Sequence, residues 1–127
     1  MEPRISVVRL TKGKLPSLPF EQYKNAILGK KYELSIVFAG STLSQQLNKQ
    51  YRDKDYPTNV LSFPLSKNEG EIIINLQKAR SEAKNFDLDY IPFVGYLLIH
   101  GMLHLKGLDH GSTMDNEEEK YRKKFSI

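Results

Sequence analysis

Four short stretches of the chain are rich in β-branched and other apolar residues and predict β-strands, the first two with the alternation of apolar and polar residues typical of one buried face. They cover residues 4–9, 32–38, 60–63 and 71–74. Pro64 is expected to end the third strand, since proline cannot donate to a strand ladder. The polar turn at 67–70 predicts that the last two strands pair as a hairpin.

Apolar residues spaced three or four positions apart predict helices between and after these strands. The expected helices cover residues 20–28, 43–51, 76–85, a stretch from a cap at Asp87 or Asp89 to about Leu105, and about 115–124. A turn at residues 40–42 supplies the N-cap of the second helix, and Gly107 ends the fourth. This order predicts an α+β fold: a single domain over residues 1–127, with four to five helices packed as one layer on a small four-stranded mixed sheet.

The composition is that of an ordinary globular protein. The 127 residues are 39% hydrophobic and 27% charged, and the absence of cysteine excludes disulfides and thiolate metal sites. The longest apolar segment, residues 91–99, is too short to span a bilayer, and the charged N-terminus does not resemble a signal peptide. We therefore expect a cytoplasmic protein that does not enter the membrane.

The net charge of +4 is mildly basic and fits a surplus of surface lysines as well as a nucleic-acid partner. Basic residues gather at the end of the second expected helix, as Lys49, Arg52 and Lys54. A second basic cluster, at residues 120–124, follows the acidic residues 117–119, an order that suits the helix dipole without any ligand.

All three histidines lie within eleven residues, in the order H-x-x-x-H-x-x-G-x-x-H. Residues four apart share a helix face, so His100 and His104 can direct their imidazoles to one point. Gly107 allows the chain to leave the helix in a left-handed conformation, which gives His110 the reach to return as a third ligand. Three histidines leave a zinc ion one open position, as in catalytic sites. One Zn²⁺ is preferred here over separately buried histidines, each satisfied by a hydrogen bond.

Gly101 stands where zinc proteases of this spacing carry their catalytic glutamate. Peptide hydrolysis by that route has therefore lost its base. A zinc ion held by three histidines suits an electrophile that is itself anionic, such as a phosphodiester. Asp109, beside the third ligand, can orient an imidazole or take a proton, and it is equally well explained as a turn residue.

The stretch that follows the second expected helix holds a candidate phosphate-binding residue. Arg52 presents a planar fork that grips phosphate at two points, and Tyr51 or Tyr56 could stack on an unpaired base. The alternative is that Arg52 pairs with Asp53 or Asp55 and only covers the neighbouring strand.

Together the two stretches resemble the YbeY family of bacterial endoribonucleases. The resemblance rests on H-G-M-L-H-L-K-G-L-D-H, on P-T-N-V-L-S-F-P with the preceding L-N, Y-R and Asp55, and on G-E-I-I-I. It implies a zinc ion on the three histidines, a functional arginine at Arg52 and cleavage of single-stranded RNA. The implied role is ribosomal RNA maturation, notably at the small-subunit 3′ end, and ribosome quality control. Ribosomal RNA, and the ribosome or its proteins, would be the partners.

Two positions depart from the family, which usually has T-D-V-L-S-F and G-D-I where this chain has Asn59 and Glu71. If the usual aspartate takes part in chemistry, activity here would be reduced or altered; if it caps a turn, Asn59 serves equally well. Two other functions stay open. One is a zinc metallopeptidase whose base comes from elsewhere, such as Glu117, and the other is an RNA-binding ribosome assembly factor with a structural zinc.

Overall fold

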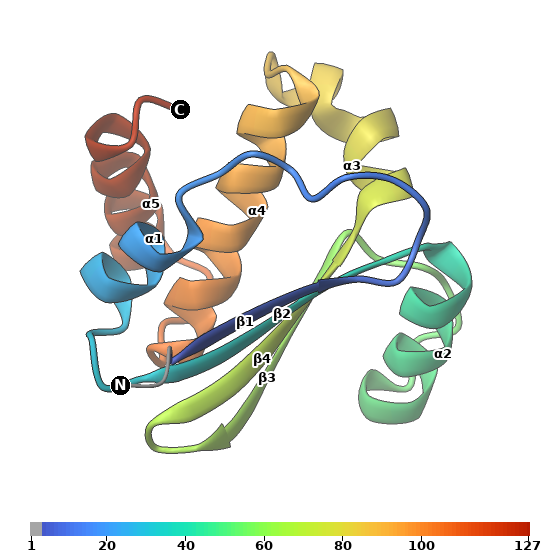
Figure 1. Cartoon of the computed structure of the whole chain (residues 1–127), viewed down its shortest axis with the longest axis horizontal. Coiled ribbons are helices and arrows are strands. Elements are labelled where there is room, and N and C mark those ends of the chain that lie inside the picture. The colour runs from blue at the N-terminus through green and yellow to red at the C-terminus, as the bar shows by residue number, and fades with distance from the viewer. Residues whose placement is uncertain (1–3) are drawn as a thin grey trace.

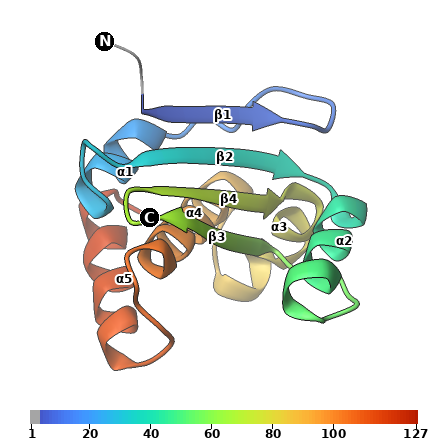
Figure 2. The ribbon, with the colours of Figure 1, turned by 90° about the horizontal axis from the view of Figure 1, so that it is seen from below.

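One mixed sheet runs through the computed structural model, which describes residues 4–127. Its strands are β1 (Ile5–Arg9), β2 (Glu33–Ala39), β3 (Val60–Ser66) and β4 (Glu69–Asn75). Their order is β1-β2-β4-β3, as Figure 2 shows. Strands β1, β2 and β4 are parallel, and β3 is antiparallel to β4. The expected α+β fold, the four-stranded mixed sheet and the hairpin are thus confirmed, and β3 is an edge strand.

The helices cover both faces of this sheet. They are α1 (Phe20–Ile27), α2 (Ser41–Arg52), α3 (Leu76–Glu82), α4 (Tyr90–Leu105) and α5 (Ser112–Lys124), with a 3-10 turn η1 (Ala83–Phe86) after α3. Helices α1, α3, α4 and α5 share the main core on one face, whereas α2 packs on the other face over Ala39, Leu61 and Ile73 (Figure 1). The expected single layer is therefore wrong for α2. Both faces of the sheet are apolar at its centre, as the unbroken Ile72–Ile74 run indicates, so both need cover.

Pro64 lies inside β3 rather than ending it. The N–H of Asn75 donates to the carbonyl of Asn59 at 2.9 Å, one position beyond the Val60–Ile74 pair. The N–H and C=O groups of successive residues point to opposite sides of a strand. Since Asn59 bonds to β4, the odd-numbered positions of β3 direct these groups to β4 and the even-numbered positions direct them away from it. Pro64 is one of these, and its missing N–H costs no ladder hydrogen bond. The strand runs on to Ser66, with a register shift after Pro64.

Helix starts differ slightly from expectation. Helix α2 begins at Ser41 with Gly40 in the N-cap position, and the Ser41 hydroxyl instead accepts a hydrogen bond from Asn75 Nδ2 at 3.1 Å. Asp89 takes the N-cap position of α4 without a side-chain capping bond. The serine therefore joins α2 to the end of β4 instead of capping the helix.

Among the described residues, no single helix is long and apolar enough to cross a membrane. The helices over residues 76–86 and 90–105 are bent by 101° at the break between them. By length and composition alone, this pair could cross a membrane together. Much of α4 is buried in the core of this structure.

Candidate metal centre

Helix α4 lies close against the sheet, and Gly101 makes this approach feasible. A Cβ atom at this position would lie 3.0 Å from Ser62 Oγ and 3.2 Å from two carbons of Ile72. The Ser62 hydroxyl donates to the Gly101 carbonyl at 3.1 Å. The position that holds the glutamate of zinc proteases is thus occupied by helix-to-sheet packing, with no space for a larger side chain.

The end of α4 redirects the chain toward the two helical histidines. Gly107 has a φ of +103°, in the region that favours glycine. The N–H of Gly107 donates to the backbone carbonyl of His104 at 3.0 Å, and the N–H of Leu108 donates to the backbone carbonyl of Leu103 at 3.1 Å. This pair of bonds is a Schellman motif, as expected for a glycine after the C-cap. The reversal brings His110 back beside the helix.

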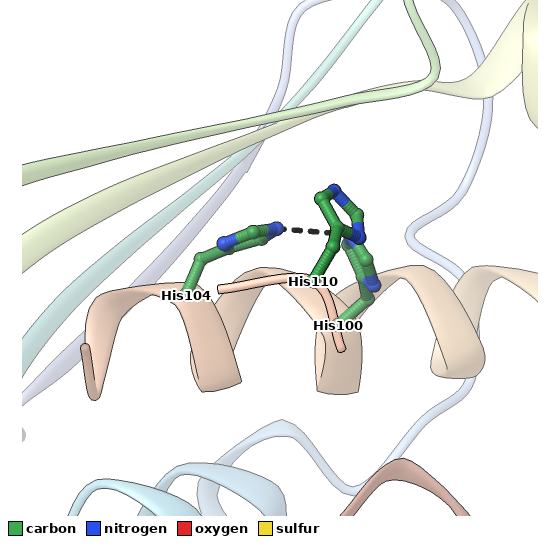
Figure 3. Close-up of side chains that lie close together, drawn as sticks. All are labelled: His100, His104 and His110. Atoms are coloured by element: carbon green, nitrogen blue, oxygen red, sulfur yellow. Dashed lines mark hydrogen bonds between the residues drawn. The ribbon is translucent and has the colours of Figure 1, made fainter. Parts of the chain in front are cut away.

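The three imidazoles meet at one place (Figure 3). One nitrogen from each of His100, His104 and His110 lies within 4.8 Å of the others. The Nε2 atoms of His100 and His104 are 3.1 Å apart, and the His110 ring centroid is 5.3 Å and 5.1 Å from the other two. This grouping brings the three nitrogens close enough together to share one metal ion. The three histidines could therefore hold one metal ion together, and an all-imidazole donor set is one that suits zinc.

Burial favours the neutral imidazole that binds a metal. Desolvation lowers the pKa of His104 below its ordinary value of 6.5, and the neighbouring His100 and His110 lower it further. A backbone hydrogen bond at Leu108 and the carboxylate of Asp109 oppose this shift. His104 is thus uncharged at neutral pH, ready to offer a lone pair.

Asp109 is exposed and lies beside the cluster, but the described residues show no hydrogen bond from it to an imidazole. The carboxylate that does contact a histidine is Glu118 of α5, which the sequence reasoning missed. Its Oε1 lies 2.5 Å from His100 Nδ1. The available signal was spacing, because Glu118 shares a helix face with Met114 and Tyr121, both buried.

A cavity of about 610 Å³ opens beside the histidines. Its lining includes the three histidines, Arg52, Tyr56, Asp109 and residues 58–62. The outward-pointing backbone of Val60 and Ser62 belongs to this wall, since the even positions of β3 face away from β4. The cavity thus joins the metal cluster to Arg52 and to the free edge of the sheet.

Arg52, the last residue of α2, lines this cavity with its side chain exposed. No carboxylate of residues 4–127 forms an ion pair with it. Asp55 is instead held by Gln45 Nε2 at 3.0 Å and by Lys49 Nζ at 3.8 Å. The alternative in which Arg52 is neutralised by a neighbouring aspartate is therefore wrong, and its guanidinium can take an anion.

Two polar residues of α2 hold the loop that forms one wall of the cavity. Asn48, fully buried, donates through Nδ2 to the Tyr56 carbonyl at 2.9 Å, and the Ser44 hydroxyl donates to the Thr58 carbonyl at 2.8 Å. Tyr56 lines the cavity, and about half of the residue is exposed. Tyr51 packs its ring on Phe63 at 5.2 Å and does not line the cavity. Tyr56 is thus the better placed of the two candidate stacking residues.

Asn59 has a partner that an aspartate could not satisfy. Its Nδ2 donates to Glu82 Oε1 of α3 at 3.0 Å, and Asn59 is among the residues that line the cavity. A carboxylate is therefore still present beside this wall, carried by α3 instead of the position just before β3. Glu71 lies within β4, opposite Phe63, and does not line the cavity.

Glu117, the candidate base for a peptidase, also lies away from the cavity. Its carboxylate is 3.8 Å from Lys120 Nζ on the same helix, and it is not among the residues that line the cavity. A general base beside the histidines is therefore provided neither at position 101, which is a glycine, nor by Glu117.

A family model and curated relatives of this chain carry the same family name. The family model described as Endoribonuclease YbeY matches residues 17–126. Endoribonuclease YbeY of Neorickettsia sennetsu is 33% identical over 140 residues, which cover 100% of this chain and 98% of that protein. Endoribonuclease YbeY of Carboxydothermus hydrogenoformans is 40% identical over 87 residues, 65% of this chain and 61% of that protein. The solution structure of TM1509 from Thermotoga maritima has a TM-score of 0.65 at 26% identity, covering 92% of this chain and 85% of that one.

Proposed function

Because this chain belongs to the YbeY family of endoribonucleases, we propose that it cleaves single-stranded ribosomal RNA with one Zn²⁺ on His100, His104 and His110. The observation that carries the proposal is the meeting of three imidazole nitrogens beside a cavity that also exposes Arg52. When bound there, zinc supplies a positive charge that acidifies water and stabilises negative charge on a phosphate.

Arg52 binds the RNA backbone in this proposal. Its guanidinium has no carboxylate partner in residues 4–127, so its donor fork is available for two phosphate oxygens. Lys54, exposed on the loop after α2, extends the positive rim. Lys49 contributes less, because it already faces Asp55 at 3.8 Å.

The cavity wall explains a preference for unpaired RNA. Tyr56 offers an exposed ring on which a base can stack, and a base inside a duplex cannot leave its neighbours without unpairing. The backbone groups of Val60 and Ser62, which face away from β4, can pair with a base edge or a ribose hydroxyl. Both contacts therefore favour single strands.

Asp109 is assigned the transfer of a proton. Its carboxylate is exposed on the cavity wall next to His110, where it can accept a proton from the attacking oxygen and return it to the leaving oxygen. The support for this assignment is the position of Asp109 on the cavity wall. Within the described residues its carboxylate forms no hydrogen bond, so it is available to accept a proton.

We extend the proposal to the maturation of the small-subunit ribosomal RNA 3′ end and to ribosome quality control, with the ribosome as partner and the cytoplasm as location. The support is the family membership and the net charge of +4. The peptidase alternative is disfavoured because Gly101 takes the place of the zinc-protease glutamate, Glu117 lies away from the cavity, and the exposed Arg52 suits an anionic phosphodiester better than a neutral peptide. A purely structural zinc is disfavoured because such sites have four protein ligands and are closed, whereas this cluster offers three beside a cavity.

The test compares a labelled single-stranded RNA with the same RNA annealed to its complement. We expect cleavage of the single strand and little cleavage of the duplex. Arg52→Ala should reduce kcat/KM at least tenfold without changing zinc content, and end-group analysis identifies the attacking oxygen. RNA binding without cleavage would contradict the proposal and support an assembly factor, and digestion of casein would support the peptidase.

A further inference from the structure

The two ring nitrogens of His100 face different partners. Its Nε2 lies 3.1 Å from His104 Nε2, inside the histidine cluster, whereas its Nδ1 lies 2.5 Å from Glu118 Oε1. A neutral imidazole carries a proton on one nitrogen and a lone pair on the other. If Nε2 provides the lone pair for a metal, Nδ1 must carry the proton and requires an acceptor.

Glu118 is a well-fixed acceptor. Its side chain is only 12% exposed, and its second carboxylate oxygen accepts from the Tyr96 hydroxyl at 3.4 Å. Burial and Glu118 itself raise the pKa of Tyr96, so this hydroxyl keeps its proton. The Arg122 guanidinium lies 5.3 Å from the Tyr96 ring centroid. The carboxylate is thus held in place from a second side, between α4 and α5.

The two adjacent glutamates have different surroundings. Glu119 forms an exposed pair with Lys123 at 3.2 Å, and Glu117 lies 3.8 Å from Lys120. Only Glu118 of this run points to the histidine cluster, so the contact is specific to one position on α5.

We propose that Glu118 is a positioning residue for the metal centre, which accepts the Nδ1–H of His100 and so fixes the tautomer whose Nε2 lone pair points to the ion. The inference rests on the proposed zinc site. Because Glu118 comes from α5, the same contact couples metal binding to the docking of α5 on α4.

The expected effect is on zinc affinity. Removing a carboxylate that holds a ligating histidine usually weakens metal binding about 10- to 100-fold. We expect a loss of about this size in Glu118→Ala. A smaller loss is expected in Glu118→Gln, which keeps an acceptor oxygen without the charge. Glu119→Gln, on the next residue of the same helix, is the matched control and should bind zinc as the original chain does.

Two measurements on the full chain test the proposal. Zinc affinity is measured by competition with a chromophoric chelator. Long-range ¹H–¹⁵N spectra of the metal-free protein report which nitrogen of His100 carries the proton. The original chain should carry it on Nδ1, and Glu118→Ala should shift the population toward Nε2, the form favoured in free imidazole side chains.

Each outcome has a separate meaning. Failure of the original chain to bind zinc would overturn the proposed function, and the tautomer would still test the contact. Tight zinc binding with equal affinity in Glu118→Ala and Glu119→Gln would overturn only the role of Glu118. If Glu118→Ala does not fold, the comparison of Glu118→Gln with the original chain tests the effect on zinc affinity. An Nε2–H tautomer of His100 in the metal-free original chain would overturn the inference.

Discussion

At the scale of single residues, Asn59 and Glu82 form a pair in which one side chain is an amide and the other an acid. Asn59→Asp would replace a charged hydrogen bond of 3.0 Å by two facing carboxylates. We expect it to lower the free energy of unfolding at pH 7 by about 1.5–3 kcal/mol, since hydrogen bonds to charged groups are of this order. Glu82→Gln in the same chain should restore most of the loss, because the amide and the acid are then exchanged.

Urea unfolding of the two single variants and the double variant measures this coupling as a double-mutant cycle. Losses that simply add in the double variant would show that the two side chains do not interact. Cleavage assays on the same proteins determine whether the carboxylate must lie at position 59, just before β3, or on α3.

The lowered pKa of His104 predicts a pH dependence of stability in the metal-free protein. The unfolded chain takes up a proton near the ordinary pKa of 6.5, whereas the folded chain does so only at lower pH. The free energy of unfolding should therefore fall as the pH drops below about 6.5 and level off below the folded-state pKa. His104→Gln removes this contribution.

Urea titrations in the presence of EDTA from pH 8 to pH 5 test this prediction. The stability of the original chain relative to His104→Gln should decrease as the pH is lowered through this range. A difference that stays constant with pH would contradict it.

The residues of the metal cluster could be predicted because their signal is local. His100, His104 and His110 are fixed relative to one another by one helix and one glycine, and spacing alone contains that information. The spacing of Glu118 from Met114 and Tyr121 singles it out from the run of three glutamates as the one on the buried face of α5, but only the packing of α5 on α4 shows that this face meets the histidines. The partner of Asn59 was equally hidden, because Glu82 lies 23 residues away.

At the scale of elements, the packing of α4 on the sheet depends on Gly101. Helix propensity alone would make Gly101→Ala stabilising by about 1 kcal/mol. Overpacking against Ser62 and Ile72 costs about 1–3 kcal/mol, so we expect a net loss of about 1 kcal/mol. Ile72→Val in the same chain should recover part of it, as it removes one of the crowded carbons.

Thermal or urea unfolding of the two proteins provides the check. An alanine variant more stable than the original chain would show that the helix is free to move away from the sheet. The same variant also indicates whether a larger residue at this position displaces the histidines, through its zinc affinity.

Element boundaries and layers were predictable only where local signals decide them. The glycine after α4 marked its end correctly, whereas Pro64 was misread because its effect depends on β3 being an edge strand. Helix α2 was assigned to the wrong face for a similar reason. Its own pattern shows that it has an apolar side, but only the sheet order shows which face lacks cover.

At the scale of the whole molecule, the proposal predicts RNA binding that weakens with salt. Each phosphate contact to single-stranded RNA contributes about 0.7 to the slope of log affinity against log salt. Lys54→Ala should reduce the slope by about this amount. Lys12→Ala is the control, because Lys12 is an exposed lysine that follows β1, at the opposite edge of the sheet from β3.

Fluorescence anisotropy with a short labelled RNA at several salt concentrations measures both slopes. Equal reductions in the two variants would indicate that RNA contacts the general surface instead of the rim of the cavity. The overall architecture was easier to predict than this rim, because hydrophobic periodicity extends over every element. The position of an exposed lysine such as Lys54 depends on how its loop folds, which no local pattern in the sequence shows.

The most direct test of the account is a zinc titration of RNA cleavage. Protein stripped of metal is mixed with increasing zinc and a labelled single-stranded RNA, beside His104→Ala prepared in the same way. The account predicts no cleavage without metal, a rise to a plateau at one zinc per chain, and no rise in the variant. Cleavage that is independent of zinc, or that persists in His104→Ala, would contradict the assignment of catalysis to the three histidines.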